Sequence, residues 1–542
     1  MASAQNEDGR DGYYDLAIIG GGISSAYTLI HYISLLEKQR PSAPVKVVVV
    51  ERSGEFWSGI PYGKRSGTHS LLISSLKEFL PQPDERKAFV NWLSKNHEWV
   101  FDKLTEGHWE LSKAWLRRNR KAMTEGRWDE LFLPRYTFGL YLQERVAKLL
   151  RHAAKTGMLE CDLVAADVVD VQRMGSRYRM DVRCDSGDCD SIQARKVILA
   201  IGSPPNCGVR RGKVVEGERE VCFFDNMYQP SLDANIERIA EVLKSADERC
   251  RKVLIAGTNA SALEALYSLK NSRRTNELIT EFVVVSSSVE FPHRIVAEGR
   301  PVRFSPQHLT VLLKKRAVQA KQILDAVRRD VARASAQKVN IASIYGEISK
   351  AMLQALEQLN VREQRRFVTR YGAEIGRMQR RAGAEYLHVV DILAKQRRIE
   401  MRKGKIGKFI SATKDGVWVE MDGAKNVKRK VFVPGISVFI CCAGFRKVSK
   451  LASTLLQNLI RREICVPNDS KRGFLINERY EAQKNFYVMG PLVAGNLAGN
   501  IRVWHAESCG RIIGMSKQLA EFLWRDASSA GTGSRRKRVS IA

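Results

Sequence analysis

The sequence lacks any apolar run that approaches the roughly 18 residues needed to cross a bilayer. Its polar, acidic beginning, MASAQNEDGRDGYY, also lacks the basic segment of a secretory signal. Only 10 of the 542 residues are cysteine, which is too few for a dense disulfide framework. These absences argue against a membrane or secreted protein and favour a cytoplasmic protein of two or three domains.

A convincing set of metal ligands is missing as well. Cys184 and Cys189, in CDSGDC, come closest, but no second ligand pair accompanies them. A turn between the strands RYRMDVRC and SIQARKVILAIG is the better interpretation of this segment. No Ser-His-Asp arrangement and no pair of catalytic carboxylates stands out either, so no metal site is expected and no hydrolytic chemistry is indicated.

Acidic residues are scarce beside basic ones, 59 against 89, which gives a formal net charge of +30. The excess gathers in helix-like segments and in the tail GSRRKRVSIA, which we expect to be disordered. Solvated basic faces explain it best; attraction of anionic substrates and cofactors, or weak nucleic-acid binding, are the alternatives. Aromatic residues are not interleaved with these charges, which disfavours nucleic-acid binding.

The sequence does contain a glycine-rich turn between an expected strand, DLAIIG, and an expected helix, ISSAYTLIHYISLLEK. Gly20 and Gly22 permit tight geometry and the close approach of a phosphate, and Ser25 takes the third small position. The helix N-terminus offers free N–H groups to a pyrophosphate. The next strand, VKVVVV, ends in Glu51, where a carboxylate would accept hydrogen bonds from a ribose. This context favours a dinucleotide site over an ordinary strand–helix turn.

A second turn of the same kind occurs in RKVLIAGTNASALEALYSLK, with Gly257, Asn259 and Ser261 in the small or turn positions. Asn259 replaces the middle glycine and tolerates left-handed geometry better than most residues. The following strand, EFVVVSSS, ends in hydroxyls from Ser286 onward rather than in a carboxylate. With Arg294 nearby, this pattern favours NADPH over NADH. The alternative is a degenerate repeat that packs but binds no nucleotide.

Three further apolar strands stop at a glycine, as expected where a sheet edge approaches a cofactor. KVILAIG ends at Gly202, VFICCAG at Gly444 and KNFYVMG at Gly490. We expect all three to serve the first dinucleotide site.

The order GGGISS, VVVVE, ILAIG, GTNASA, FICCAG and YVMG resembles that of flavoproteins with two dinucleotide-binding domains. More narrowly, it resembles the bacterial FAD/NAD(P)-binding proteins related to the N-hydroxylating flavin monooxygenases. The resemblance runs across nearly the whole chain and implies an α/β fold with two Rossmann-like domains. The expected division is an FAD domain at 14–240 and 431–525, an NAD(P)H domain at 241–430 with a basic helical insertion at about 305–400, and a disordered basic tail at 526–542.

The chain departs from that family's pattern in several places. Ile73 stands where asparagine is usual, Gln379 where histidine is expected, and Gly490-Pro491 where many flavoproteins have Gly-Asp. These departures put individual flavin contacts in doubt.

The resemblance implies FAD and NADPH as cofactors and, in the related enzymes, oxygen and an amine or amino acid as substrates. In the glycine-rich loop after Gly490, Arg502 is a candidate to hold a substrate carboxylate. Asn500 flanks the same loop, and His505 is a candidate to donate to the flavin or to orient the substrate. A structural role is the alternative for His505, as it is for His69.

The expected function is therefore that of an NADPH-using flavin monooxygenase that hydroxylates a nitrogen atom. A flavin dehydrogenase or oxidase without oxygen insertion is one alternative, and a non-catalytic FAD-binding redox sensor or scaffold is another. A homo-oligomer is a further possibility, and neither the substrate nor the pathway can be read from the residues.

Overall fold

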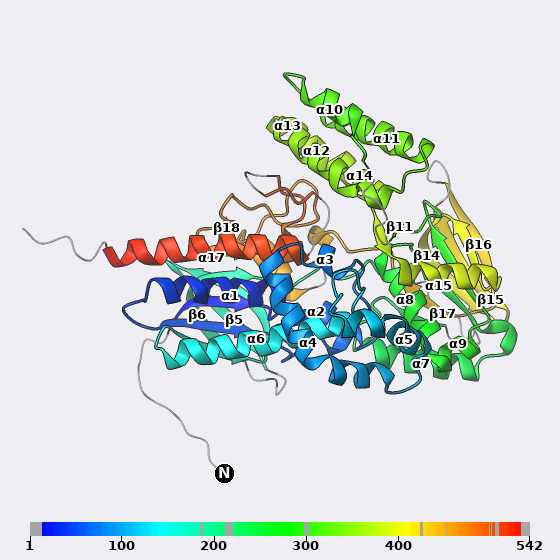
Figure 1. The fold of residues 1–542 in the computed structure, drawn as a ribbon, viewed down its shortest axis with the longest axis horizontal. Helices are drawn as coiled ribbons and strands as arrows, with labels where there is room; N and C mark the ends of the chain where they lie inside the picture. The colour runs from blue at the N-terminus through cyan, green and yellow to red at the C-terminus, as the bar shows by residue number, and fades with distance from the viewer. Residues whose placement is uncertain are drawn as a thin grey trace, which may run out of the picture.

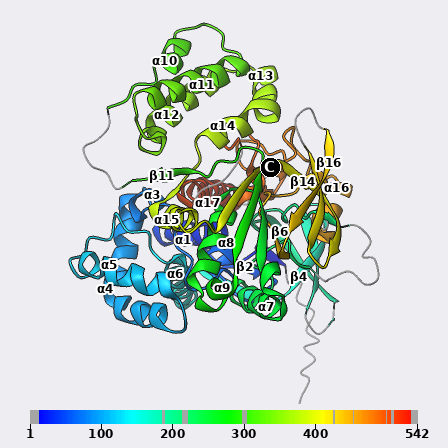
Figure 2. The same ribbon diagram turned by 90° about the vertical axis from the view of Figure 1, so that its right-hand side faces the viewer.

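The computed structural model describes residues 13–184, 187, 189–211, 221–296, 303–422, 427–450, 453–497, 499, 501–504 and 509–532. Two sheets form the body of the molecule, and a group of helices rises above it as a separate lobe (Figure 1). In the perpendicular view the lobe again stands apart from both sheets (Figure 2).

The first sheet has eight strands and follows the order β18-β19-β6-β1-β2-β3, with β4 and β5 attached to β6 as an antiparallel pair. Its central strands are parallel, so their carboxyl ends share one edge. The strands are β1 (Tyr14–Ile19), β2 (Val45–Val50), β3 (Leu159–Val164), β4 (Asp167–Met174), β5 (Arg177–Arg183), β6 (Cys189–Leu199), β18 (Glu481–Gln483) and β19 (Phe486–Val488).

Helices cover this sheet, and the first and last of them, α1 and α17, lie side by side (Figure 1). Within the described residues, none of the helices combines the length and apolarity that a membrane crossing demands. The helices associated with this part of the chain are α1 (Ile23–Lys38), α2 (Gly59–Tyr62), α3 (Leu76–Phe79), α4 (Pro83–Thr105), α5 (Glu110–Thr124), α6 (Arg135–Lys155), α16 (Thr454–Arg461) and α17 (Cys509–Thr532).

The second sheet is parallel throughout and follows the order β13-β10-β9-β17-β8. Apolar side chains of its strands pack against a smaller sheet of order β16-β15-β14-β7 to form one core cluster. The strands of the two sheets are β7 (Arg210–Arg211), β8 (Cys222–Phe224), β9 (Lys252–Ala256), β10 (Glu281–Ser286), β13 (Ile399–Lys403), β14 (Lys405–Thr413), β15 (Gly416–Asp422), β16 (Lys428–Pro434) and β17 (Ile436–Cys441). The helices beside them are α7 (Leu232–Ser245), α8 (Ala260–Asn271), α9 (Arg273–Leu278) and α15 (Ala384–Lys395).

The helical lobe has an apolar core of its own, to which Leu497 and Trp504 of the C-terminal segment contribute. A short two-stranded sheet, β11 (His293–Ile295) with β12 (Arg381–Gly383), connects its two ends to the body. The lobe consists of α10 (Gln307–Leu313), α11 (Ala320–Ala336), α12 (Tyr345–Glu357), α13 (Val361–Arg366), a π-helical turn at Phe367–Tyr371, and α14 (Gly372–Met378). α15, which fell inside the expected insertion, instead packs on α8.

One strand lies in a different sheet from the one predicted. The prediction grouped VFICCAG, and with it Gly444, with the first sheet, but Phe439 of β17 pairs with Leu254 of β9 in the second sheet. β8, inside the predicted first part of the FAD domain, pairs with β17 as well. The placement is therefore wrong: an apolar strand that ends at a glycine satisfies either sheet, and the local sequence does not distinguish them.

The first residues of the predicted tail are helical instead. Residues 526–532 continue α17, and the Asp526 carboxylate accepts a hydrogen bond of 2.6 Å from the Arg479 guanidinium. The basic residues of GSRRKRVSIA from 533 onward lie outside the described residues.

The turn after β9 generates a stability prediction. A methyl group on Gly257 would lie 2.4 Å from the Cys442 carbonyl oxygen, and the φ of +112° disfavours any L side chain. We expect Gly257→Ala to lower the free energy of unfolding by about 2 kcal/mol or more, measured by urea titration. Gly514→Ala in α17, where a Cβ meets nothing within 4 Å, is the control and should not destabilise. Equal stability of Gly257→Ala and the wild type would contradict this account.

Candidate dinucleotide sites and the seam between them

The first glycine turn is held by contacts that leave no room for a side chain at its start. Gly20 has a φ of +100°, and a Cβ there would lie 2.6 Å from the Ala200 carbonyl oxygen. The Gly20 N–H donates to the Val50 carbonyl at 2.8 Å, and the Ser25 hydroxyl donates to the Gly20 carbonyl. Gly20 and the buried Ser25 therefore shape the turn itself rather than a ligand surface.

Gly22 plays a different part, because its surroundings are open. It caps α1 with extended backbone, and a Cβ there would meet only Gly59, at 3.6 Å. No side chain caps the helix, so its first N–H groups and positive dipole end remain available to an anion. The Glu51 carboxylate accepts the Gly21 N–H at 2.8 Å and so lies beside the turn, at the end of β2. This cradle suits a pyrophosphate.

Gly59 was missed by the sequence reasoning. It has a φ of +59° and faces Gly22 across the cradle, where a Cβ would approach Gly22 at 3.2 Å. The segment WSGIPYG carries the signal, because its two glycines flank a proline, a pattern typical of a special turn.

Gly202 and Gly490 border the same sheet edge. Gly202, with a φ of +80°, follows β6 and faces open space. Gly490 begins the 3₁₀ turn η7 (Gly490–Val493), and a Cβ on it would lie 2.9 Å from the Ser24 hydroxyl in the first turn of α1. The structure thus brings both predicted glycines to the edge that carries Gly22.

The second glycine turn repeats the first one contact by contact. The Gly257 N–H donates to Val285 at 2.8 Å, as Gly20 does to Val50. Gly257 lies against Cys442 as Gly20 lies against Ala200. β17 is therefore the counterpart of β6, and Gly444, whose φ is +93° and which faces open space, corresponds to Gly202.

Asn259 occupies the position that corresponds to Gly22, and it does so without strain. Its φ and ψ of −77° and −178° nearly match the −85° and −165° of Gly22. Left-handed geometry is thus not required at this position, and the substitution of asparagine for glycine costs the backbone nothing. The Asn259 side chain does not cap α8, and Ala260 and Ser261 are exposed in the first turn.

A small pocket lies beside this second turn, between Ser261 and Glu264 of α8 and Cys441 at the end of β17. Tyr228 closes it, and its hydroxyl donates to the Glu264 carboxylate. Glu264 in turn accepts a hydrogen bond of 2.6 Å from the buried Arg135 at the start of α6. Burial lowers the pKa of the Arg135 guanidinium, but the Glu264 carboxylate outweighs that effect and holds the pKa above its ordinary value.

Ser286 ends β10, where its hydroxyl lies 3.0 Å from that of Thr258. The exposed Lys403 pairs with it in register on β13, a neighbour that the sequence reasoning missed because it lies 117 positions further along the chain. Arg294, the cation proposed from the sequence, instead pairs with Asp391 of α15 at 2.5 Å. Lys403 is therefore the cation that the sheet brings directly beside Ser286.

The three residues proposed for catalysis differ in outcome. Arg502 pairs with Glu357 of α12 at 3.4 Å and so ties the C-terminal segment to the lobe. Asn500 and His505 lie outside the described residues.

His69 is a structural residue of the body. Its ring stacks on Trp109 at 4.3 Å, and its Nδ1 lies 3.1 Å from the Ser112 hydroxyl. Asn271, at the end of α8, donates to the same hydroxyl at 2.9 Å. Burial lowers the pKa of His69 to about 3, so the ring is neutral and joins α5 to α8.

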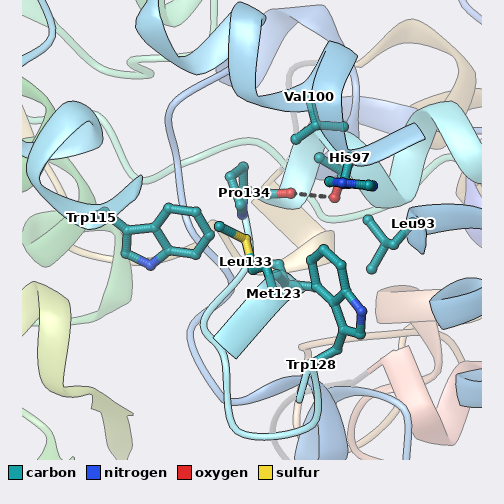
Figure 3. A pocket seen from close by; sticks show the side chains of 9 residues that line it. Leu93, His97, Val100, Trp115, Met123, Trp128, Leu133 and Pro134 are labelled. Atoms are coloured by element: carbon teal, nitrogen blue, oxygen red, sulfur yellow. Dashed lines mark hydrogen bonds between the residues drawn. The ribbon is translucent and has the colours of Figure 1, made fainter. Parts of the chain in front are cut away.

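A second small pocket lies among α4, α5 and α6. Figure 3 shows its lining, in which Trp115, Trp128 and Met123 surround the Leu133–Pro134 segment. His97 is the one acidic or basic side chain in this lining, and the rest is mainly apolar, so the site is poorly suited to hold a phosphate or a carboxylate.

Comparison with known proteins agrees with this geometry. A family model described as FAD-NAD(P)-binding matches residues 17–204, which include β1, the first glycine turn and Gly202. The uncharacterized protein Rv3403c of Mycobacterium tuberculosis is 30% identical over 514 residues, covering 94% of this chain and 95% of that protein. The uncharacterized protein Mb3437c of Mycobacterium bovis matches to the same extent.

The chain belongs to this family of FAD-NAD(P)-binding proteins. Among solved structures, the reduced ornithine hydroxylase PvdA of Pseudomonas aeruginosa is similar with a TM-score of 0.55 and 13% identity, covering 95% of this chain and 99% of that one. The ornithine N-hydroxylase KtzI of Kutzneria sp. 744 is similar with a TM-score of 0.52 and 14% identity, covering 95% and 100%. The predicted α/β fold with two dinucleotide-binding units is thereby confirmed.

The buried histidine generates a pH prediction. Between its folded pKa of about 3 and the ordinary value of 6.5, His69 binds a proton more readily in the unfolded chain than in the folded one. Folded stability should therefore fall as the pH drops below 6.5, with a slope contribution of at most about 1.4 kcal/mol per pH unit. Urea titrations between pH 4.5 and 7 should show a shallower slope for His69→Gln than for the wild type. His388→Gln, at an exposed position, should leave the slope unchanged.

Proposed function

We propose that the protein is an NADPH-dependent flavin monooxygenase that hydroxylates the nitrogen of an amine or amino acid. The observation that carries the proposal is the duplication of one strand–glycine–helix turn in two sheets whose central strands are parallel, each with an uncapped helix N-terminus. The likeness to ornithine N-hydroxylases in fold supports it.

FAD is assigned to the first sheet. Its pyrophosphate would lie in the cradle of Gly22 and Gly59 at the N-terminus of α1, and its ribose beside Glu51. Gly202 leaves open the sheet edge along which the rest of the cofactor would extend, and Gly490 packs against Ser24 of α1 at the same edge. Gly444 is assigned to the second nucleotide instead, because its strand belongs to the second sheet.

NADPH is assigned to the second sheet. Its pyrophosphate would lie at Asn259 and Ser261, at the N-terminus of α8. The 2′-phosphate would meet Ser286 and Lys403 at the ends of neighbouring strands, where β10 offers no carboxylate to repel it. Arg294 remains a candidate for the same contact, but its ion pair with Asp391 would compete with it.

Reduced FAD would supply the activation of oxygen, and the polypeptide would bind and orient the reactants. Both nucleotide sites open at the carboxyl edges of their sheets, where ligands of such sheets bind. The Arg135–Glu264–Tyr228 network lies between them and keeps the second turn in place relative to α6. This division of labour needs no hydrolytic triad, in agreement with its absence from the sequence.

A flavin dehydrogenase or oxidase uses the same parts without inserting oxygen, and a scaffold would retain FAD alone. The unstrained backbone at Asn259 and the uncapped N-terminus of α8 favour a functional second site over the scaffold.

Two substitutions in the first glycine turn distinguish a defect in cofactor binding from a defect in folding. Gly22→Val adds a side chain where only Gly59 is close, so the protein should fold normally yet purify without the yellow colour of bound FAD. Absorbance at 450 nm and a urea titration measure the two effects. Gly20→Ala, which meets the Ala200 carbonyl, should instead lose stability. Full FAD occupancy in folded Gly22→Val would show that the FAD pyrophosphate does not bind in the cradle of Gly22 and Gly59.

The choice of nicotinamide cofactor tests the second site. Anaerobic mixing with NADPH should bleach the flavin faster than mixing with NADH, and Lys403→Ala should raise the NADPH concentration needed by about tenfold while leaving NADH unchanged. Arg294→Ala should have the smaller effect, because Asp391 already neutralises that cation. Admission of oxygen with candidate amines should then give hydroxylated products, detected by mass spectrometry. Flavin that neither nucleotide reduces would favour the scaffold.

A further inference from the structure

Three arginines from two distant parts of the chain converge at the seam between the helical lobe and the body. Arg377 and Arg380 lie at the end of α14, joined by a hydrogen bond of 3.2 Å from the Arg380 N–H to the Arg377 carbonyl. Arg472 lies in a turn of the C-terminal segment, where its N–H donates to the Ser470 hydroxyl at 3.1 Å.

Direct contacts fix this convergence. Arg365 of α13 pairs with Asp469, in the same turn as Arg472, at 3.0 Å. A Cβ on Gly372, at the start of α14, would lie 3.2 Å from the Trp504 ring. The two segments are therefore packed together, and the charges of Arg377 and Arg472 are close enough to act on that of Arg380.

The positive charge of this region is not neutralised by the carboxylates around it. Glu374 is paired with Arg328 at 2.5 Å, Asp469 with Arg365, and Glu78 with Arg381 at 2.7 Å. In the part of the chain that the structure describes, no carboxylate lies within the 4.0 Å of an ion pair from any of the three arginines.

The arginines also act on one another. Burial and the neighbouring positive charges of Arg377 and Arg472 lower the pKa of the Arg380 guanidinium. Burial and Arg377 lower the pKa of Arg472 in the same way. Arg380 and Arg472 are half-buried and Arg377 is exposed. Half-buried like charges without a counter-ion are costly, so an anion beside Arg380 and Arg472 would be stabilised.

Gln379 supplies an independent observation. It lies between Arg377 and Arg380 in the sequence and is only 6% exposed. Its side-chain Nε2 has no hydrogen-bond partner among the residues that the structure describes. This buried N–H₂ group is therefore free to donate to an acceptor from outside the described residues.

The cluster is tied on one side to the segment of Ile73 and on the other to η7, which borders the first dinucleotide site. The Gly383 N–H, three residues after Arg380, donates to the Ile73 carbonyl at 2.8 Å. On the other side, the turn that carries Arg472 is tied to η7, because Asn468 donates to the Ala494 carbonyl at 2.7 Å and Phe474 to Leu492 at 2.9 Å. An anion bound here would lie near the edge assigned to the flavin.

We propose that Arg377, Arg380 and Arg472, with the Gln379 amide, bind a carboxylate group of the substrate. The inference rests on the proposed function and narrows its substrate to an amine that carries at least one carboxylate. Guanidinium groups present paired N–H donors that match the two oxygens of a carboxylate. These residues take the role that the sequence had suggested for Arg502, whose guanidinium pairs with Glu357 instead.

The binding test needs no catalysis. Succinate and acetate serve as probes, and the melting temperature of the FAD-loaded protein is recorded against potassium chloride of equal ionic strength. We expect succinate to raise the melting temperature of the wild type at millimolar concentration. The half-saturating concentration should rise at least about tenfold in Arg380→Gln and in Arg472→Gln. Arg370→Gln, which removes an exposed arginine from the same part of the lobe, should behave as the wild type.

A merely structural role makes the opposite prediction. If the arginines stabilise the fold, Arg380→Gln should melt below the wild type without any anion; the proposal expects it to melt at the same temperature or higher, because a repulsion is removed. Equal responses to succinate in Arg380→Gln and the wild type, or a lower melting temperature without anion, would overturn the proposal.

A second measurement tells whether the cluster binds a substrate carboxylate or a nucleotide phosphate. It also tests the proposed function independently of the carboxylate site. Anaerobic reduction of the flavin by NADPH should proceed at the wild-type rate in Arg380→Gln. A slower reduction with an unchanged succinate response would reassign the cluster to the nucleotide and overturn the carboxylate site. Failure of NADPH to reduce the wild-type flavin would count against the proposed function alone, because the succinate titration does not depend on it.

Discussion

A buried ion pair holds the two halves of this molecule in one orientation. Arg135 begins α6, which packs on the first sheet, and Glu264 lies in α8 of the second, directly behind the turn of Asn259. Removing two charges from water is costly, and the pair persists because its geometry is close and the Tyr228 hydroxyl adds a further donor. The pair therefore fixes the second turn relative to α6, and it acts together with other contacts between the halves, such as the hydrogen bond from Asn271 of α8 to the Ser112 hydroxyl of α5. The loss of one partner alone would leave a buried charge between the sheets.

The second constraint is the repeated turn. In each sheet a glycine lies so close to the carbonyl at the end of a neighbouring strand, Ala200 or Cys442, that no other residue fits. The positions after these glycines differ, and there the two sites diverge: Gly22 faces another glycine, whereas Asn259 presents an amide. The repeat thus preserves the contacts that build the turn and varies those that would meet a ligand. Such a pattern indicates two sites with one architecture and different ligands.

Much of the fold could be predicted from the sequence, because its signals are local. The strand before Gly20, the helix from Ile23 to Lys38 and the second turn at Gly257 all follow from apolar runs, glycine and helical spacing. The sheet that receives VFICCAG could not be predicted, because pairing depends on a partner nearly two hundred residues away. Arg294 and Arg502 were sensible candidates by residue type, but their guanidinium groups pair with Asp391 and Glu357. Lys403 and the arginine cluster could not be predicted from the sequence either, because their neighbours are distant in the sequence and only the folded chain brings them together.

The lobe's core has a consequence for the order in which the chain folds during synthesis. Its helices end at Met378, yet Leu497 and Trp504 complete its apolar interior. The ribosome must therefore add more than a hundred further residues after α14 before the lobe can bury its last surface. The first sheet is likewise incomplete until β19 has been synthesised and pairs with β6. Nascent chains of this protein thus carry two unfinished cores at once, and the C-terminal segment closes both together.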